Sequence, residues 1–179
     1  NCSATSRLIV HNAVKAPLME RIEARLRDWK TGDPLDPGTH IGALIDAEHC
    51  KKVRSFLDSK DDGPFVSPVV VEVSADDARA RDEIFGPVLS VIEVASNDEA
   101  VAVANDTDYG LAASVFSAGG RSAIRAARDI KAGTVTVNCY GEGNIATPFG
   151  GYKQSGFGGR DNGLHAHDQY TETKTIWID

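Results

Sequence analysis

Apolar positions along the chain follow two spacings. Short runs of apolar and β-branched residues predict strands at residues 8–10, 66–73, 88–94, 111–116, 134–137 and 171–178. Longer segments, in which apolar residues recur every three or four positions, predict helices at residues 16–30, 46–59, 96–105 and 121–131. Because strands and helices alternate from Val66 to Val137, the pattern predicts an α/β fold with a mainly parallel sheet flanked by helices.

Individual residues indicate where several of these elements begin and which side of a helix is buried. Pro68 lies inside the predicted strand at 66–73 and indicates either an edge strand or a later start. Ser96 and Glu99 have the spacing of a capping box that opens a helix. In the last predicted helix, we expect Ile124 and the apolar residues in phase with it to face inward.

The segment from Asn138 to Gly163 is rich in glycine and has no apolar periodicity. Gly141, Gly143 and Ala146 are spaced as in a dinucleotide-binding fingerprint, and Asp161 follows 20 residues after Gly141. That fingerprint needs a helix that starts among the glycines, and the proline and glycines that follow forbid one. A glycine-rich loop is therefore the better interpretation, and a loop of this length in a compact domain is more often functional than idle.

Composition and charge narrow the class of protein. The chain has 179 residues, 41% hydrophobic and 25% charged, with a net charge of −7 at pH 7. These values are typical of a soluble globular domain and argue against a disordered tail or a basic nucleic-acid binder. No apolar run approaches the roughly 20 residues that span a bilayer. We therefore expect one domain with neither a nucleic-acid nor a membrane partner.

Three cysteines, Cys2, Cys50 and Cys139, are too few for a disulfide scaffold and favour a reducing, cytoplasmic location. Cys2 is a candidate nucleophile, because a thiolate attacks carbonyl carbons readily. From the residues alone, an incidental cysteine is the better interpretation. His165 and His167 make half of a metal site, but no further ligands stand at a suitable spacing, so we expect no metal.

Glu83 and Phe85 lie in a Glu-Ile-Phe-Gly-Pro turn directly before the predicted strand at 88–94. A carboxylate beside an aromatic ring suits the hydroxyls of a sugar next to a stacking surface. From spacing alone, a solvated glutamate and a core phenylalanine remain the better interpretation.

Five segments follow one another in a recognisable order: Cys2-Ser3-Ala4-Thr5-Ser6-Arg7, residues 83–88, Asn105 with residues 109–113, residues 132–138, and residues 148–156. Together they resemble the C-terminal part of the aldehyde dehydrogenase superfamily, and the resemblance covers nearly the whole chain. Residues 138–144, 164–166 and 174–177 are most similar to the members that oxidise γ-glutamyl-γ-aminobutyraldehyde and related amino-aldehydes.

This resemblance implies an NAD(P)-dependent oxidation of an aldehyde to a carboxylic acid. Cys2 would attack the aldehyde carbon to give a thiohemiacetal, and loss of a hydride would leave a thioester for hydrolysis. Glu83 would hold the nicotinamide-ribose hydroxyls, and Phe85 would lie beside that ribose or the ring.

On the substrate side, the resemblance assigns Phe149 to the aldehyde tunnel and Asn138 to the floor of the active site. Gly143 stands where some relatives have an aromatic residue, which would widen the tunnel. Glu142 is either a group that attracts a substrate ammonium or merely an exposed side chain, and both interpretations stay open.

The resemblance also implies a division of the chain. Residues 1–168 would be part of a catalytic domain, and residues 169–179 a terminal strand that adds to a partner subunit's sheet, in a homodimer or tetramer of the full-length protein. The family's NAD-binding domain, oxyanion asparagine and general base precede the cysteine and are absent from this chain. Because the only methionine is Met19, we expect a piece of a longer protein that oxidises no aldehyde alone.

Two alternatives remain. The first is a non-catalytic fragment that serves interaction or oligomerisation, and the second is a self-sufficient dinucleotide-binding domain. The connection at residues 59–64 is shorter than is usual in the family, through either a lost strand or missing residues.

Overall fold

The computed structural model describes residues 1–57, 59, 62–141 and 143–179. The chain divides into two compact units, where the sequence predicts one domain portion up to residue 168. We refer to Ala4–Val103 as the parallel-sheet unit and to Asn1–Ser3 with Ala104–Asp179 as the loop-rich unit. Each unit is described by itself.

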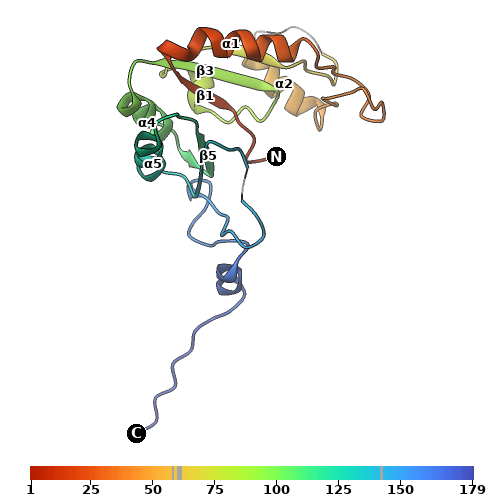
Figure 1. The fold of residues 1–179 in the computed structure, drawn as a ribbon. Coiled ribbons are helices and arrows are strands. Elements are labelled where there is room, and N and C mark those ends of the chain that lie inside the picture. The colour runs from red at the N-terminus through yellow and green to blue at the C-terminus, as the bar shows by residue number, and fades with distance from the viewer. Residues whose placement is uncertain (58, 60–61, 142) are drawn as a thin grey trace. The chain divides into compact units, whose positions relative to one another are not determined.

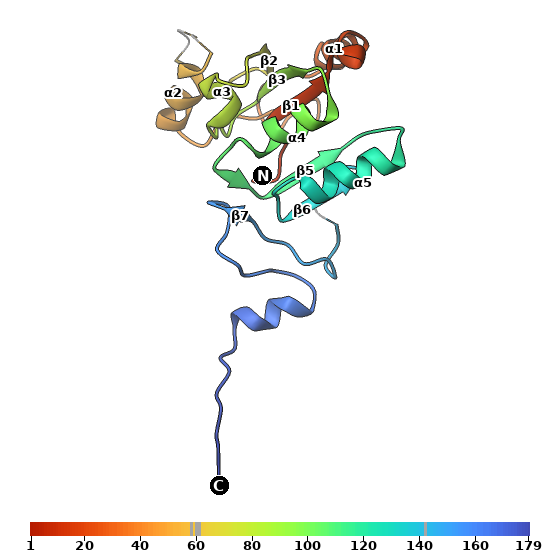
Figure 2. The ribbon, with the colours of Figure 1, turned by 90° about the vertical axis from the view of Figure 1, so that its left-hand side faces the viewer.

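The parallel-sheet unit is built around three parallel strands in the order β1 (Arg7–His11), β3 (Val88–Val94) and β2 (Val69–Glu72); Figure 1 labels β1 and β3, and Figure 2 labels all three. The central strand β3 is mostly buried because it has a neighbour on each side. Its bounds agree with the predicted strand, and the parallel pairing confirms the predicted α/β fold class.

Pro68 precedes β2, and the structure shows both the late strand start and the edge position that the sequence offered as alternatives. The strand begins at Val69, immediately after Pro68, and β2 lies at an edge of the sheet. Proline has no backbone N–H to donate, so Val69 makes the first ladder bond, to the Pro87 carbonyl at 2.9 Å.

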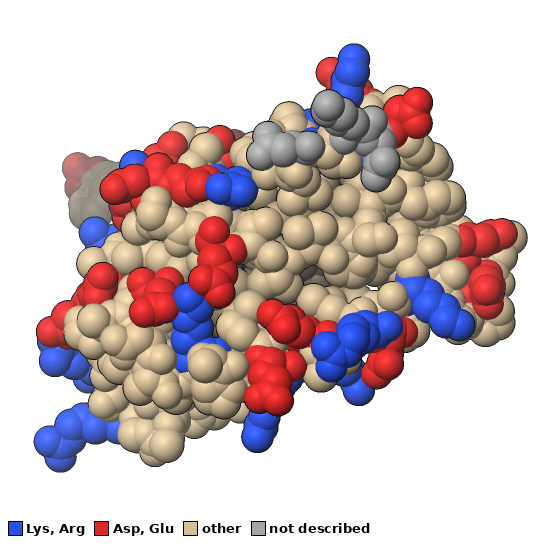
Figure 3. Space-filling model, turned by 90° about the horizontal axis from the view of Figure 1, so that it is seen from above, with Lys and Arg blue, Asp and Glu red and all other residues tan. Residues whose placement is uncertain are grey.

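Helix α1 (Asn12–Leu26) lies along one side of this sheet (Figures 1 and 2). It begins earlier than predicted because the His11 side chain caps it, accepting a hydrogen bond from Ala13 N–H at 3.2 Å. It also ends earlier, so Trp29 lies outside the helix. On the face seen in Figure 3, acidic and basic side chains are interspersed.

A partly exposed cluster of one lysine and two glutamates holds α1 to the sheet. Lys15 Nζ lies 2.6 Å from Glu72 Oε2 on β2 and 2.9 Å from Glu93 Oε2 on β3. The hydrogen bonds to Glu72 and Glu93 raise the pKa of Lys15. The helix and two strands are thereby joined through one ammonium group.

Helix α2 (Ala47–Ser55) starts at Asp46, whose carboxylate accepts from His49 N–H at 2.7 Å. Val53 on α2 is fully buried, and the core cluster that it joins consists of Val53, Val66, Ile84 and Val88. The helix is shorter than the predicted 46–59, and the short connection at 59–64 lies partly outside the described residues.

Two further helices complete this unit. The four-residue α3 (Ala78–Arg81) is too short to show a periodic pattern and was not predicted. Helix α4 (Asn97–Asn105) confirms the Ser96 half of the capping box, since Glu99 N–H donates to Ser96 Oγ at 3.1 Å; Glu99 Oε2 accepts from Ala95 N–H, at 2.7 Å, one residue before the expected donor.

The loop-rich unit holds two small sheets and two helices. Strands β5 (Ala112–Val115) and β6 (Thr134–Val137) pair in parallel, and β4 (Tyr109–Gly110) and β7 (Tyr152–Lys153) pair antiparallel. The helices are α5 (Gly120–Asp129) and the 3₁₀ helix η1 (Leu164–Gln169). The predicted inward position of Ile124 on α5 is wrong: it is 50% exposed, and Ala123, one position earlier, is the buried residue.

Residues 171–179 form no strand in this chain, contrary to the prediction for 171–178. All of them are exposed, and the tail extends away from the rest of its unit (Figure 1). A strand exists only where a second backbone accepts and donates its ladder bonds, and no described segment pairs with this one.

Among the described residues, no helix is both long enough and apolar enough to cross a bilayer.

Candidate functional site

The turn before β3 presents Glu83 and Phe85 outward together. Ile84, between them, is only 4% exposed and belongs to the core cluster. Gly86 lies so close to Val53 that a Cβ there would stand 2.7 Å from the Val53 side chain, which requires glycine. Residues 84 and 86 therefore anchor the turn, while the side chains of residues 83 and 85 face solvent.

The backbone of Phe85 is unusual. Its φ is 59°, in the left-handed region that bulky residues avoid. Helix α2 contacts the turn at two carbonyls: His49 Nε2 donates to Phe85 O at 2.9 Å, and Lys52 Nζ donates to Glu83 O at 2.8 Å. The His49 and Phe85 rings meet edge to face, with centroids 6.4 Å apart.

The exposed groups of this turn fit a ribose and a flat ring. In the described chain, nothing donates to the Glu83 carboxylate, so its oxygens can accept from sugar hydroxyls. Phe85 is 50% exposed and offers an aromatic face. The turn thus offers carboxylate acceptors and an exposed aromatic face, and the interpretation of Phe85 as a core residue is wrong.

Cys2 is an exposed free thiol in the loop-rich unit. The Asn1 side-chain oxygen accepts from Ser3 N–H at 3.2 Å and from Ser3 Oγ at 3.0 Å, and it lies 4.0 Å from Cys2 Sγ. Tyr140 Oη donates to Ser3 O at 3.2 Å, which ties the cysteine turn to the segment after β6. The chain around the thiol is therefore held while the sulfur stays accessible.

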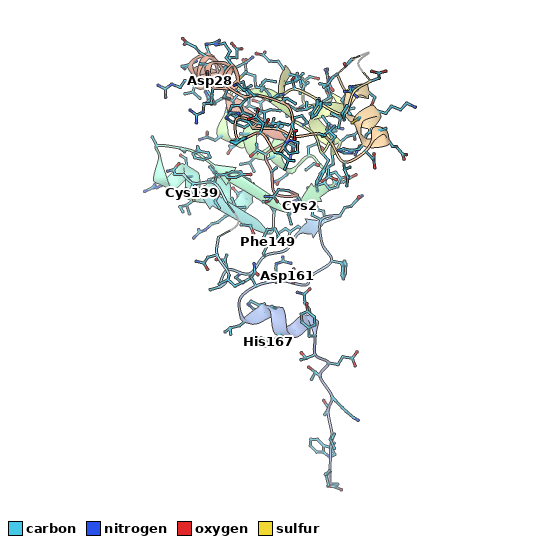
Figure 4. All side chains as sticks on the ribbon, turned by 90° about the vertical axis from the view of Figure 1, so that its right-hand side faces the viewer. Cys2, Asp28, Cys139, Phe149, Asp161 and His167 are labelled. Carbon is cyan, nitrogen blue, oxygen red and sulfur yellow. The ribbon has the colours of Figure 1, made fainter. Side chains whose placement is uncertain are left out.

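The other two cysteines differ from Cys2 in their surroundings. Cys50 is buried on α2, with Sγ 3.7 Å from the Pro64 carbonyl. Cys139 is an exposed free thiol, and Figure 4 shows it well separated from Cys2.

Asn138 ends β6 with φ at 53°, and both ends of its side-chain amide are bonded. Its Oδ1 accepts from Ser117 N–H at 2.8 Å, and its Nδ2 donates to Ser117 O at 3.0 Å. The amide thus joins the chain after β5 to the chain after β6. The Asn138 side chain therefore fixes the local backbone.

Phe149 is half-buried in the glycine-rich segment and is paired through its backbone with Asp161. Each residue donates its N–H to the carbonyl of the other at 2.7 Å, and Figure 4 shows the two side by side. No helix starts among the described residues between Asn138 and Gly163, which confirms a loop in place of the dinucleotide-binding fingerprint.

Two remaining candidates can be treated briefly. Glu142 lies outside the described residues. His165 Nδ1 lies 3.7 Å from Asp168 Oδ2, and in the described ranges no group of three His, Cys, Asp or Glu side chains is placed to hold a metal ion.

Comparison with known proteins decides the family. Residues 1–176 match the profile of the aldehyde dehydrogenase family. The chain belongs to this family. It is 55% identical over 193 residues to aminoacetaldehyde dehydrogenase of Pseudomonas aeruginosa, a match that covers 100% of this chain and 39% of that protein.

Solved structures of aldehyde dehydrogenases have the same fold. An indole-3-acetaldehyde dehydrogenase in complex with NAD⁺ matches with a TM-score of 0.92 and 41% identity, over 99% of this chain and 39% of that one. A γ-glutamyl-γ-aminobutyraldehyde dehydrogenase from Burkholderia cenocepacia matches with a TM-score of 0.89 and 44% identity, over 96% and 38%. The chain thus spans about two fifths of the length of the aldehyde dehydrogenases that it matches.

Sequence reasoning missed His49 and Lys52, the two α2 residues that contact the Glu83–Phe85 turn. Their spacing of three places them on one face of a helix, which is visible in the sequence. Nothing in the sequence, however, indicates that this face lies against a turn more than thirty residues away.

Proposed function

We propose that residues 1–179 are part of an NAD(P)-dependent aldehyde dehydrogenase that oxidises an aldehyde to the carboxylic acid, with Cys2 as nucleophile. The observation that carries this proposal is the family match over residues 1–176, a range in which Cys2 is an exposed free thiol. Glu83 and Phe85 support it, because their exposed groups suit the nicotinamide half of the cofactor.

Cys2 begins the reaction by forming a bond from its thiolate sulfur to the aldehyde carbon, and the electron pair of the C=O π bond moves to oxygen. The resulting alkoxide needs a hydrogen-bond donor. The backbone N–H of Cys2 is suited to this, since none of the described residues accepts from it.

Glu83 would hold the cofactor by accepting hydrogen bonds from its ribose hydroxyls, and Phe85 would cover one side of that ribose or ring. A bound NAD(P)⁺ would supply the acceptor for the hydride that leaves the former aldehyde carbon. Water then attacks the thioester on Cys2, which releases the carboxylic acid and restores the thiol.

An amino-aldehyde is the substrate class that we favour. The relative with 55% identity is named aminoacetaldehyde dehydrogenase, and a solved neighbour acts on γ-glutamyl-γ-aminobutyraldehyde. We assign Phe149 to the wall of the aldehyde tunnel and Asn138 to the backbone of its floor. Glu142 would supply the charge that attracts a substrate ammonium, as the net charge of −7 does at longer range.

The three free thiols also suit a reducing compartment, and we propose a cytoplasmic location.

The test uses the complete protein that contains this chain, with formation of reduced cofactor as the readout. Cys2→Ala is expected to lower kcat by about a thousandfold or more, because the covalent step is lost. Cys139→Ala, which removes the other exposed thiol, is the matched control and should leave kcat near that of the unsubstituted enzyme.

Two further measurements complete this experiment. Iodoacetamide should label Cys2, and aldehyde together with NAD⁺ should protect it. The ratio kcat/KM should be higher for aminoacetaldehyde than for acetaldehyde. Full activity of Cys2→Ala would contradict the mechanism, whereas equal kcat/KM for both aldehydes would contradict only the substrate class.

A further inference from the structure

Phe85 has a left-handed backbone conformation that phenylalanine does not favour. A bulky, non-glycine residue at φ 59° persists only where its surroundings hold it there. The buried Ile84 and the close approach of Gly86 to Val53 fix the backbone on either side of Phe85.

The carbonyl of Phe85 is held by His49. The distance of 2.9 Å from His49 Nε2 to Phe85 O is that of a hydrogen bond, and a carbonyl oxygen only accepts. Nε2 therefore carries the proton. The edge-to-face contact between the two rings, with 71° between their planes, restrains the Phe85 side chain as well as its backbone.

Helix α2 gives His49 a rigid base. Asp46 caps the helix through the His49 N–H at 2.7 Å, and the next residue along the helix, Cys50, is buried. One turn further on, Lys52 Nζ donates to Glu83 O at 2.8 Å. The same face of α2 thus contacts the carbonyls of both residues whose side chains the proposed cofactor site uses.

We propose that His49 is a positioning residue for the nicotinamide half of the cofactor: it holds Phe85 in its left-handed conformation and thereby sets the direction of the Phe85 ring. This inference rests on the proposed function. It predicts that loss of the His49 donor weakens binding of the nicotinamide half and leaves binding of the adenosine half unchanged.

The donor at Nε2, and not the ring as such, is the essential feature. A glutamine amide can donate to the same carbonyl, whereas an alanine side chain has no donor. His49→Ala should therefore let Phe85 relax, and His49→Gln should restore much of the lost binding. A purely structural role for His49 would weaken binding of every part of the cofactor together.

The experiment measures dissociation constants of NAD⁺ and of AMP for the complete protein by titration calorimetry. AMP carries the adenosine half of the cofactor and lacks the nicotinamide ribose. For His49→Ala we expect the dissociation constant of NAD⁺ to rise about five- to tenfold, as loss of one hydrogen bond implies, with that of AMP within about twofold of its original value. Lys51→Ala, an exposed substitution on the same helix, is the matched control and should change neither.

A second variant keeps the test decisive if His49→Ala perturbs folding. Glycine adopts positive φ without strain, so Phe85→Gly makes the restraint unnecessary. In a Phe85→Gly background, His49→Gln and His49→Ala should bind NAD⁺ equally, since no ring remains to be placed.

The outcomes separate the two proposals. Equal weakening of NAD⁺ and AMP in His49→Ala, no weakening of either, or failure of His49→Gln to restore NAD⁺ binding would overturn the positioning role. If the unsubstituted protein bound AMP but not NAD⁺, the proposed cofactor site itself would be wrong, and the inference would be overturned with it.

Discussion

Asp77 uses both carboxylate oxygens to hold the first turn of α3. Arg79 N–H donates to Oδ1 at 2.8 Å, and the Arg79 guanidinium contacts Oδ1 at 2.9 Å and Oδ2 at 2.6 Å. These hydrogen bonds lower the pKa of Asp77 from 3.8 to about 2. A carboxyl that is more acidic in the folded chain than in the unfolded one stabilises the fold while it is ionised. That contribution is present above the unfolded pKa and is lost as the pH falls through the folded pKa.

Replacement of Asp77 by asparagine should therefore lower the free energy of unfolding at neutral pH and have a shrinking effect between about pH 4 and pH 2, the interval set by the two pKa values of 3.8 and about 2. Urea unfolding of both proteins over this pH range measures the difference. Asp76→Asn is the matched control, because the Asp76 side chain is 93% exposed and pairs with Arg81 at 3.3 Å near the surface. A difference for Asp77→Asn that stays constant down to pH 2 would contradict this account.

The candidate site illustrates how far single residues can be predicted. The family motifs select Glu83, Phe85 and Cys2, but spacing alone favoured a core Phe85, which the structure shows to be half-exposed. The positive φ of Phe85 leaves no trace in the sequence, because phenylalanine is not a residue that marks such a conformation. The contact with His49 was equally invisible, since it depends on how α2 lies against the turn.

At the scale of whole elements, the sequence predicts the bounds of buried strands best. Strands β3 and β6 agree with their predicted bounds because continuous β-branched runs mark a buried strand. The start of α1 was missed because histidine is a rare cap. The elements α3, β4 and β7 have only two to four residues, too few for a pattern to repeat, and they were not predicted.

In the glycine-rich segment, the backbone at Gly150 lies in close contact with the backbone at Gly133. A Cβ on Gly133 would stand 1.6 Å from the carbonyl oxygen of Gly150, so the backbone before β6 and the segment before β7 approach as closely as they do only because residue 133 is glycine. Gly133→Ala must push these two backbones apart. We expect it to lower the free energy of unfolding by about 1–3 kcal/mol or more, as overpacking does.

The control for this prediction comes from the same unit. Gly120 opens α5, and a Cβ there meets nothing within 4 Å. Because alanine favours a helix, Gly120→Ala should leave the protein unchanged or stabilise it by about 0.5–1 kcal/mol. Thermal or urea unfolding of the complete protein distinguishes the two variants. Equal stability of both would show that the close approach of Gly133 to Gly150 is not needed.

At the scale of the whole molecule, the C-terminal tail exposes large apolar side chains. Ile176, Trp177 and Ile178 are three consecutive large apolar residues, and Trp177 is 88% exposed. A β-branched segment with apolar side chains and unpaired backbone groups is suited to addition to a sheet edge. We therefore keep the proposal that residues 171–179 become a strand on a sheet of a second copy of the complete protein, in a homodimer or tetramer.

Thr175→Pro tests this assembly, because proline removes a backbone N–H from the middle of the proposed strand. We expect the dissociation constant of the oligomer to rise about tenfold, measured by sedimentation over a range of protein concentrations. Thr175→Ser keeps the N–H and should assemble like the unsubstituted protein. Unchanged mass in Thr175→Pro would mean that the tail makes no intersubunit strand.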